Sequence, residues 1–196
     1  MTRIQTDVLV VGGGVAGLAA AAAFGSAGFS VVCVDAAPPV TMPEEDGSDL
    51  RSTAFLAPSV DLLRRAGLWD RLSREAAPLR VMRIAEAGDD DGAIRETADF
   101  AADDVGAEVF GYNLPNWLLR REMTAHLADG GIPLWAPARI VDLTTRLDRA
   151  LVRLADGGIV TARLVVAADG RDSFVREALG IETRRWGYGQ KALVFA

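Results

Sequence analysis

The sequence predicts an α/β fold with a mainly parallel β-sheet, and three features near its start indicate this. Residues 7–11 are a short Val-rich apolar run, of the kind that forms a strand buried on both faces. An Ala-rich stretch follows through Phe24 and is typical of a closely packed helix. Gly28 is placed to end that helix, and residues 29–34 form a second β-branched run. The order of these segments predicts a βαβ unit.

The turn between the first strand and the helix carries glycines in the spacing G-x-G-x-x-G. Gly12 permits a sharp turn, Gly14 lets the backbone approach a pyrophosphate, and Gly17 lets the helix pack close to the sheet. The helix N-terminus then presents free N–H groups to phosphates. Asp35, 18 residues after Gly17, is placed to accept hydrogen bonds from an adenosine ribose. These features predict a dinucleotide site, and a glycine turn without a ligand is the alternative.

Composition limits the class of protein. The chain has 196 residues, half of them hydrophobic, which predicts one sizeable core or a large domain with a small appendage. A net charge of −6 argues against nucleic-acid binding. Cys33, the single cysteine, is expected to be a small buried hydrophobe rather than a reactive thiol. No membrane-spanning run or signal peptide is visible, so a cytoplasmic location is expected.

Loops, helices and strands are predicted beyond Asp35. Proline and acidic residues favour an exposed loop over residues 36–49, and apolar spacing favours a helix over residues 59–72 that breaks at Gly67. Residues 78–86 alternate apolar and polar side chains, which predicts a strand with one face in water. Asp89-Asp90-Asp91-Gly92 is a turn signal, so residues 94–100 are predicted to form a hairpin with the strand at 78–86. A helix is predicted at 117–128. Further strands are predicted at 132–141, 142–147, 150–154 and 159–168.

Few side chains suggest catalysis. His126, the single histidine, is expected to be structural or at the surface, which excludes a His-based triad or metal site. No catalytic residue and no metal ligand is therefore assigned. Asp169 and Gly170 directly follow an apolar strand, at the sheet edge where open α/β sheets bind ligands. Asp169 is also well placed to cap a following helix or to lie in a turn.

Several motifs together resemble the class A flavoprotein aromatic hydroxylases, within these the ubiquinone-biosynthesis hydroxylases of the 2-octaprenyl-6-methoxyphenol hydroxylase type. The resemblance covers nearly the whole chain. The family pattern Asp-Gly, Ser, Arg is met by Asp169, Gly170, Ser173 and Arg176. The other matching segments, beside the opening glycine motif, are LRSTAFLAPSVDLLRRAGLWDRL from residue 50, YNLPNWLLRREM from residue 112, ADGRDSFVREALGI from residue 168 and WGYGQKALV from residue 186.

The resemblance implies a Rossmann-like FAD/NAD(P)-binding domain, interrupted by part of a β-rich substrate domain. Residues 1–75 and 105–185 would form the first, and residues 76–104 and 186–196 the second. It places Asp35 on the adenosine ribose, Arg51 near the pyrophosphate, and Asn116 and Arg120 along the flavin. The implied cofactor-binding residues are Gly12, Gly14, Val15, Ala16, Gly17, Asp35, Arg51, Asn116, Arg120, Val141, Asp169 and Gly170.

The implied activity is monooxygenation, in which FAD reduced by NADH or NADPH activates O₂ and a small aromatic or prenylated phenol is hydroxylated. Association with the membrane surface or with a quinone-biosynthesis complex would fit such a substrate. Two other readings remain open. One is another FAD-dependent oxidoreductase of the halogenase or prenyl reductase type, and the other is a non-catalytic protein of the GDP-dissociation-inhibitor type.

Two departures from the family pattern affect these expectations. Ala36 stands where the family often has a basic residue after the ribose-binding acid. Family members are also longer, with a later Gly-Asp motif that would lie beyond residue 196. We therefore expect a fragment or truncated product that stops inside a substrate-domain strand at residues 195–196. Such a chain should bind FAD weakly or not at all, self-associate through an open apolar strand edge, and not hydroxylate by itself.

Overall fold

A six-stranded sheet forms the centre of the protein in the computed structural model, which describes residues 3–88 and 92–194. The predicted α/β fold with a mainly parallel sheet is confirmed, because β8, β2, β1 and β11 run parallel while β10 and β9 extend the sheet antiparallel. The strands in spatial order are β8 (Leu134–Trp135), β2 (Val31–Val34), β1 (Arg3–Val11), β11 (Ile159–Ala167), β10 (Ala150–Leu154) and β9 (Ile140–Thr145).

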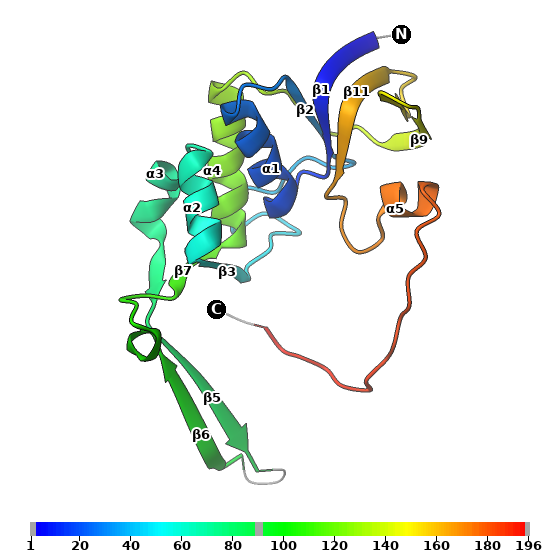
Figure 1. Ribbon diagram of the computed structural model, residues 1–196. Coiled ribbons are helices and arrows are strands. Elements are labelled where there is room, and N and C mark those ends of the chain that lie inside the picture. The colour runs from blue at the N-terminus through cyan, green and yellow to red at the C-terminus, as the bar shows by residue number, and fades with distance from the viewer. Residues whose placement is uncertain (1–2, 89–91, 195–196) are drawn as a thin grey trace.

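Both faces of the central strand β1 are buried, which explains its continuous run of apolar residues. Val8 and Val10 contribute to a core with the helices α1 (Val15–Ser26), α2 (Ala57–Arg65) and α4 (Asn116–Asp129), which lie together in Figure 1. Leu9 and Val11 face a second core on the opposite side, formed with the antiparallel strands and α5 (Phe174–Ala178). The first βαβ unit therefore lies at the centre of the molecule.

Glycines with positive φ end the first two long helices. Gly28 (φ +87°) follows α1, where the N–H of Gly28 donates to the Gly25 carbonyl and the N–H of Phe29 donates to the Phe24 carbonyl. Gly67 (φ +72°) separates α2 from the short helix α3 (Trp69–Leu72), at the predicted break. A 3₁₀ helix, η1 (Ser73–Glu75), continues from α3.

A second, three-stranded antiparallel sheet, which is separate from the main sheet, was not predicted from the sequence. It pairs β3 (Ser52–Leu56) with β7 (Gly111–Pro115), and β7 with β4 (Ala77–Leu79). Because β7 leads directly into α4, this sheet fixes where α4 begins. The predicted single strand over residues 78–86 is therefore wrong, since its first part belongs to β4 and the rest to a different sheet.

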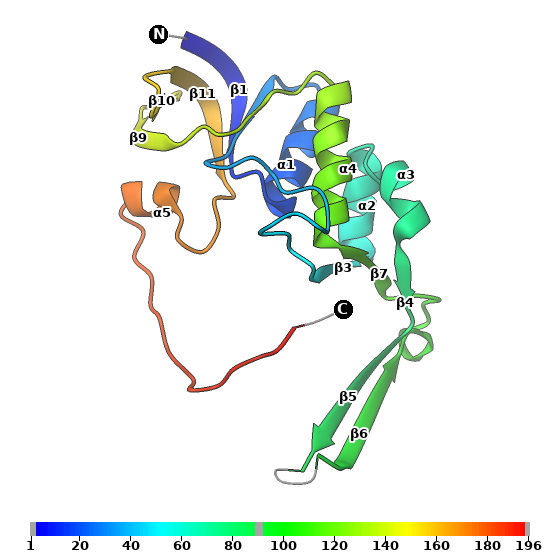
Figure 2. The same ribbon diagram turned by 180° about the vertical axis from the view of Figure 1, so that it is seen from behind.

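The predicted hairpin is present as β5 (Val81–Ala87) and β6 (Ile94–Ala101), and it projects from the body of the molecule (Figure 2). The expectation of a single solvent-facing side is wrong. Val81 and Ile84 point to opposite faces, yet each is 56% exposed, because no described element packs on either face. The turn residues 89–91 lie outside the described residues. The 3₁₀ helix η2 (Ala102–Val105) follows the hairpin.

The predicted strand over residues 132–141 is also wrong. Its first part is β8, which pairs with β2 at one edge of the main sheet, and its last residues begin β9 at the other edge. Pro137 lies between them and lacks the N–H that a continuous ladder would need. Residues 182–194 form no helix or strand, and the strand expected at residues 195–196 falls outside the described residues. The division into two domains stays a prediction.

Candidate dinucleotide-binding site

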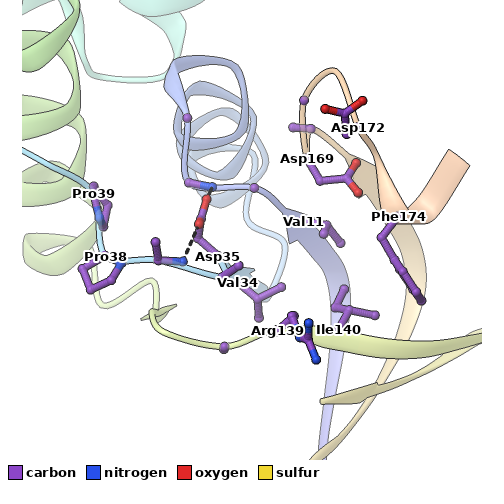
Figure 3. A pocket seen from close by; sticks show the side chains of 18 of the residues that line it. Val11, Val34, Asp35, Pro38, Pro39, Arg139, Ile140, Asp169, Asp172 and Phe174 are labelled. Carbon is purple, nitrogen blue, oxygen red and sulfur yellow. Dashed lines mark hydrogen bonds between the residues drawn. The ribbon is translucent and has the colours of Figure 1, made fainter. Parts of the chain in front are cut away.

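A cavity of about 570 Å³ lies at the carboxyl ends of the parallel strands β1, β2 and β11 (Figure 3). This is the edge of the sheet where the sequence predicted a ligand. Its walls are the β1–α1 turn, the loop after β2, the segment before β9 and the segment after β11. The lining residues are Val11, Gly12, Gly13, Gly14, Val34, Asp35, Ala36, Ala37, Pro38, Pro39, Val40, Arg120, Ala138, Arg139, Ile140, Ala168, Asp169, Gly170, Asp172 and Phe174.

The three glycines of the motif have different steric environments. Gly12 has φ +112°, and a Cβ there would lie 2.2 Å from the carbonyl oxygen of Ala168, which directly follows the neighbouring strand β11. A Cβ on Gly17 would lie 1.8 Å from the carbonyl oxygen of Gly12. A Cβ on Gly14 would meet nothing within 4 Å. The protein itself therefore requires glycine at positions 12 and 17, whereas position 14 faces the open space of the cavity.

Asp35 directly follows β2, with its carboxylate directed at the glycine turn (Figure 3). Oδ2 accepts a hydrogen bond from the N–H of Gly13, and Oδ1 accepts one from the N–H of Ala37 at 2.8 Å. The carboxylate thus joins the turn to the loop after β2. Each oxygen keeps further lone pairs for a hydroxyl donor in the cavity.

Asp169 lies on the opposite side of the cavity, at the N-terminus of α5. Its Oδ1 accepts a hydrogen bond from the Ser173 hydroxyl at 2.6 Å, and its Oδ2 accepts one from the N–H of Val175 at 3.1 Å. Ser173 in turn accepts from the N–H of Arg176 as the N-cap of α5. Asp169 therefore supports the helix cap that the sequence suggested, and it also lines the cavity together with Gly170 (φ +84°).

Arg51 and Asn116 lie outside the lining residues, in a polar network centred on Asp49. The Arg51 guanidinium donates twice to the Asp49 carboxylate, at 2.7 and 2.8 Å. Asn116 is buried, donates Nδ2 to Asp49 at 2.9 Å and accepts from the Thr53 hydroxyl at 2.6 Å. Hydrogen bonds from Arg51, and then from Asn116, hold the pKa of Asp49 well below its usual range.

The remaining predicted residues divide between the cavity and its surroundings. Arg120 lines the cavity from α4, one helical turn after Asn116. Val15 and Ala16 form the first turn of α1 beside the cavity, and Val141 lies next to the lining residue Ile140. Sequence reasoning missed the other lining residues, most of which come from loops that give no periodic signal. They are Val11, Gly13, Val34, Ala36, Ala37, Pro38, Pro39, Val40, Ala138, Arg139, Ile140, Ala168, Asp172 and Phe174.

Cys33 is fully buried in β2, as expected for a small core residue. Burial, and then the nearby charge of Asp35, raise the pKa of the Cys33 thiol to about 12, so it stays protonated at neutral pH. Within residues 3–88 and 92–194, no group of three or more His, Cys, Asp or Glu side chains is arranged to hold a metal ion. In the same ranges no helix is both long and apolar enough to cross a bilayer.

The fold and the site together define a dinucleotide-binding α/β protein. A glycine turn follows the central parallel strand, the helix after it has no acidic residue in its first turn, and a carboxylate directly follows the next strand. Free N–H groups and the positive end of the helix dipole therefore face the cavity. This arrangement is typical of sites in α/β proteins where a glycine turn meets the phosphates of a nucleotide and a carboxylate meets its ribose.

Comparison with known proteins identifies the family. The chain belongs to the FAD binding domain family, whose model matches residues 5–192. It is 40% identical over 191 residues to the ubiquinone hydroxylase UbiL of Rhodospirillum rubrum, covering 96% of this chain and 42% of that protein. It is 30% identical over 200 residues to the 3-demethoxyubiquinol 3-hydroxylase of Escherichia coli, covering 100% of this chain and 49% of that protein. The predicted kinship with FAD-binding monooxygenases, and with ubiquinone hydroxylases among them, is confirmed.

Solved structures agree with this assignment. PqsL of Pseudomonas aeruginosa, described as a probable FAD-dependent monooxygenase, superposes with a TM-score of 0.68 at 27% identity. The match covers 94% of this chain and 48% of PqsL. The chain thus spans about half the length of the curated relatives it matches.

Proposed function

We propose that this chain carries the FAD-binding part of a monooxygenase that hydroxylates an aromatic ubiquinone precursor with NADH or NADPH as reductant. The observation that supports this most directly is the glycine-lined cavity in a chain 40% identical to a ubiquinone hydroxylase. In the net reaction, the ring carbon exchanges its hydrogen for a hydroxyl. One oxygen atom of O₂ enters the product, and the other becomes water with the two electrons of NAD(P)H and one further proton.

The described residues fit the adenosine and pyrophosphate parts of FAD. Gly14 leaves open space in front of the α1 N-terminus, where a pyrophosphate can approach the backbone N–H groups. Asp35 lines the same cavity, and we assign it to the adenosine ribose. When bound, FAD supplies the redox chemistry and the activation of O₂. The contribution of this chain is to bind and orient the cofactor.

The aromatic substrate and the ring of the flavin need a second set of residues that exclude water. We assign residues 76–104 and 186–196 to part of the substrate domain and residues 1–75 and 105–185 to the FAD-binding domain. The hairpin β5–β6 supports this division, because it projects from the body with apolar side chains exposed on both faces. Such a surface is stable in water only as part of a larger assembly.

The function is tested by supplying the chain with FAD, NADPH and a phenolic ubiquinone precursor. We expect weak but saturable FAD binding, and hydrogen peroxide in place of hydroxylated product, because the described residues do not enclose a dry pocket around the flavin ring. Absence of any flavin binding would contradict the proposal and favour a non-catalytic protein. Hydroxylated product in stoichiometric amounts would show instead that these residues suffice for the complete reaction.

Asp35→Ala is expected to weaken FAD binding by roughly 1.5–3 kcal/mol, the usual contribution of a hydrogen bond to a charged group. Titration of the chain with FAD, followed by flavin fluorescence, measures the change. Asp172→Ala is the matched control, because Asp172 also lines the cavity but its side chain is 80% exposed and paired with Arg185. Equal affinities for wild type and Asp35→Ala would refute the ribose assignment.

A further inference from the structure

One wall of the cavity is a loop that few interactions hold in place. Residues 36–49, here called the wall loop, follow β2, and residues 36–40 among them line the cavity. None of the loop residues is buried, so no side chain anchors the loop in a hydrophobic core. Among the described residues, no hydrogen bond joins residues 38–48 to the rest of the chain, since the backbone bonds formed there are internal. The position of the wall loop therefore depends on its two ends.

Asp35 fixes the start of the wall loop. Its Oδ1 accepts a hydrogen bond from the N–H of Ala37 at 2.8 Å, and its main-chain carbonyl accepts one from the N–H of Ala138 at 2.6 Å. These bonds hold the start of the loop against the end of β2 and the segment before β9. They do not reach residues 38–40, which form the rest of this wall.

Asp49 fixes the other end, because its carboxylate accepts several hydrogen bonds. Arg51 donates from Nε at 2.7 Å, from a terminal guanidinium nitrogen at 2.8 Å and from its main-chain N–H at 3.2 Å. Asn116 donates from Nδ2 at 2.9 Å. The Asp49 side chain is only 15% exposed, so these donors replace most of its hydration. Since Arg51 is a near neighbour in the chain, Asn116 is the donor that ties the loop to another element.

Asn116 is a firm attachment point, because other hydrogen bonds hold it in place. It is buried as the first residue of α4, and its N–H donates to the Arg51 carbonyl at 2.8 Å. Its Oδ1 accepts from the Thr53 hydroxyl on β3 at 2.6 Å. One turn further along α4, Arg120 lines the cavity. The bond from Asn116 to Asp49 therefore sets how the wall loop lies relative to a helix that forms another part of the cavity wall.

We propose that Asp49 is a positioning residue that holds the end of the wall loop on α4 and so keeps residues 38–40 in place for the ligand. Asp49 is not among the residues that line the cavity, so it acts through the loop. Without its carboxylate the loop would sample many conformations, and a ligand would have to order it on binding, which lowers the affinity. The identity of the ligand rests on the proposed FAD binding, whereas release of the loop is measurable without a ligand.

Limited proteolysis with a glutamate-specific protease tests the release of the loop directly. The wall loop carries Glu44 and Glu45, and the exposed hairpin β5–β6 carries Glu86 and Glu96 as an internal reference. In Asp49→Ala we expect cleavage after the two loop residues to be at least about tenfold faster than in wild type, with cleavage in the hairpin unchanged. Mass spectrometry of the fragments separates the two regions.

Ligand binding is measured on the same variants. FAD affinity, followed by flavin fluorescence, should fall by about fivefold to fiftyfold in Asp49→Ala. Saturating FAD should restore slow cleavage of the loop. Asp49→Asn should recover much of the affinity and of the resistance to cleavage, because the Asn116 amide and the Thr53 hydroxyl can reverse their donor and acceptor roles to match it.

Asp61→Ala is the matched control for the loss of a carboxylate. Asp61 also pairs with an arginine, Arg64, but it lies exposed on α2 and does not line the cavity. The substitution should change neither loop cleavage nor FAD affinity. Asn116→Ala should release the loop as Asp49→Ala does, and the variant that carries both substitutions should release it no further.

Four results of these measurements would overturn the role of Asp49. They are unchanged cleavage of the loop in Asp49→Ala, an equal increase in the loop and the hairpin, additive effects of Asp49→Ala and Asn116→Ala, and no recovery in Asp49→Asn. A released loop with wild-type FAD affinity would also overturn it, because the ligand would then not need the wall loop. If the wild-type chain bound no FAD, the proposed function would be contradicted, and the cleavage rates would still decide whether Asp49 holds the loop.

Discussion

Replacing Gly17 with alanine is expected to lower the free energy of unfolding by at least about 3 kcal/mol, even when no cofactor is present. The added Cβ would lie 1.8 Å from the Gly12 carbonyl oxygen, so helix α1 would have to move away from β1. The backbone of Gly12 cannot move to make room, because its N–H donates to the Val34 carbonyl and its Cα faces the backbone of Ala168. In an ordinary helix, the same substitution would stabilise by up to about 1 kcal/mol.

Gly25→Ala is the matched control for this substitution, since Gly25 lies on the same helix and is also close to another group. Its Cβ would meet the tip of the Ile132 side chain at 2.3 Å, and that side chain can change its rotamer. We expect Gly25→Ala to change the free energy of unfolding by less than about 1 kcal/mol. Urea unfolding followed by circular dichroism measures both variants. Similar midpoints for the two would show that α1 can shift freely against the sheet.

The first βαβ unit was predictable because its sequence pattern and its environment agree. The strand β1 is buried on both faces, so it needs a continuous apolar run, and steric contact at Gly12 and Gly17 leaves no alternative to glycine. The end of α1 was predictable for the same local reason, since Gly28 has a positive φ. Such features depend on a few neighbouring residues.

Strands whose burial or length depends on residues far away in the sequence were predicted less well. The alternating pattern of residues 78–86 suggested one buried face, but whether a face is buried depends on what packs against it, and for β5 no described element does. The segment 132–141 does not form one strand, because its two ends belong to different strands at opposite edges of the sheet. Neither fact is encoded in the local sequence.

The same reasoning applies to the site. Arg51 and Asn116 were placed on the cofactor by resemblance alone, and their present partners could not be foreseen. Asn116 bonds to Asp49 and to Thr53, which are 67 and 63 residues away in the chain. Asp35 and the glycine turn were found from spacing, because they belong to one supersecondary unit. The sequence therefore predicted a phosphate and a ribose position, which stay predictions. The structure added the loop residues of the cavity and the partners of Arg51 and Asn116.

Gly14→Val is expected to abolish FAD binding while leaving the fold intact, which is the reverse of the effect at Gly17. The backbone at Gly14 has φ −75° and ψ 175°, which any residue adopts, and a Cβ there would meet nothing within 4 Å. The protein alone therefore tolerates valine, apart from a change of about 1 kcal/mol at the helix N-cap. A pyrophosphate in front of the α1 N-terminus would instead collide with the added side chain, because it needs close approach to the backbone.

The affinity for FAD should fall more than a hundredfold in Gly14→Val, with little change in the circular dichroism spectrum or in the urea midpoint. Ala27→Val is the control, because it adds the same branched side chain at the exposed C-terminal end of α1, away from the cavity. Equilibrium dialysis against FAD and ADP-ribose measures both variants. If Gly14→Val retained FAD at wild-type affinity, the pyrophosphate could not lie over this turn. Loss of both ligands in a folded Gly14→Val variant, with Ala27→Val unaffected, would locate the phosphates at the N-terminus of α1.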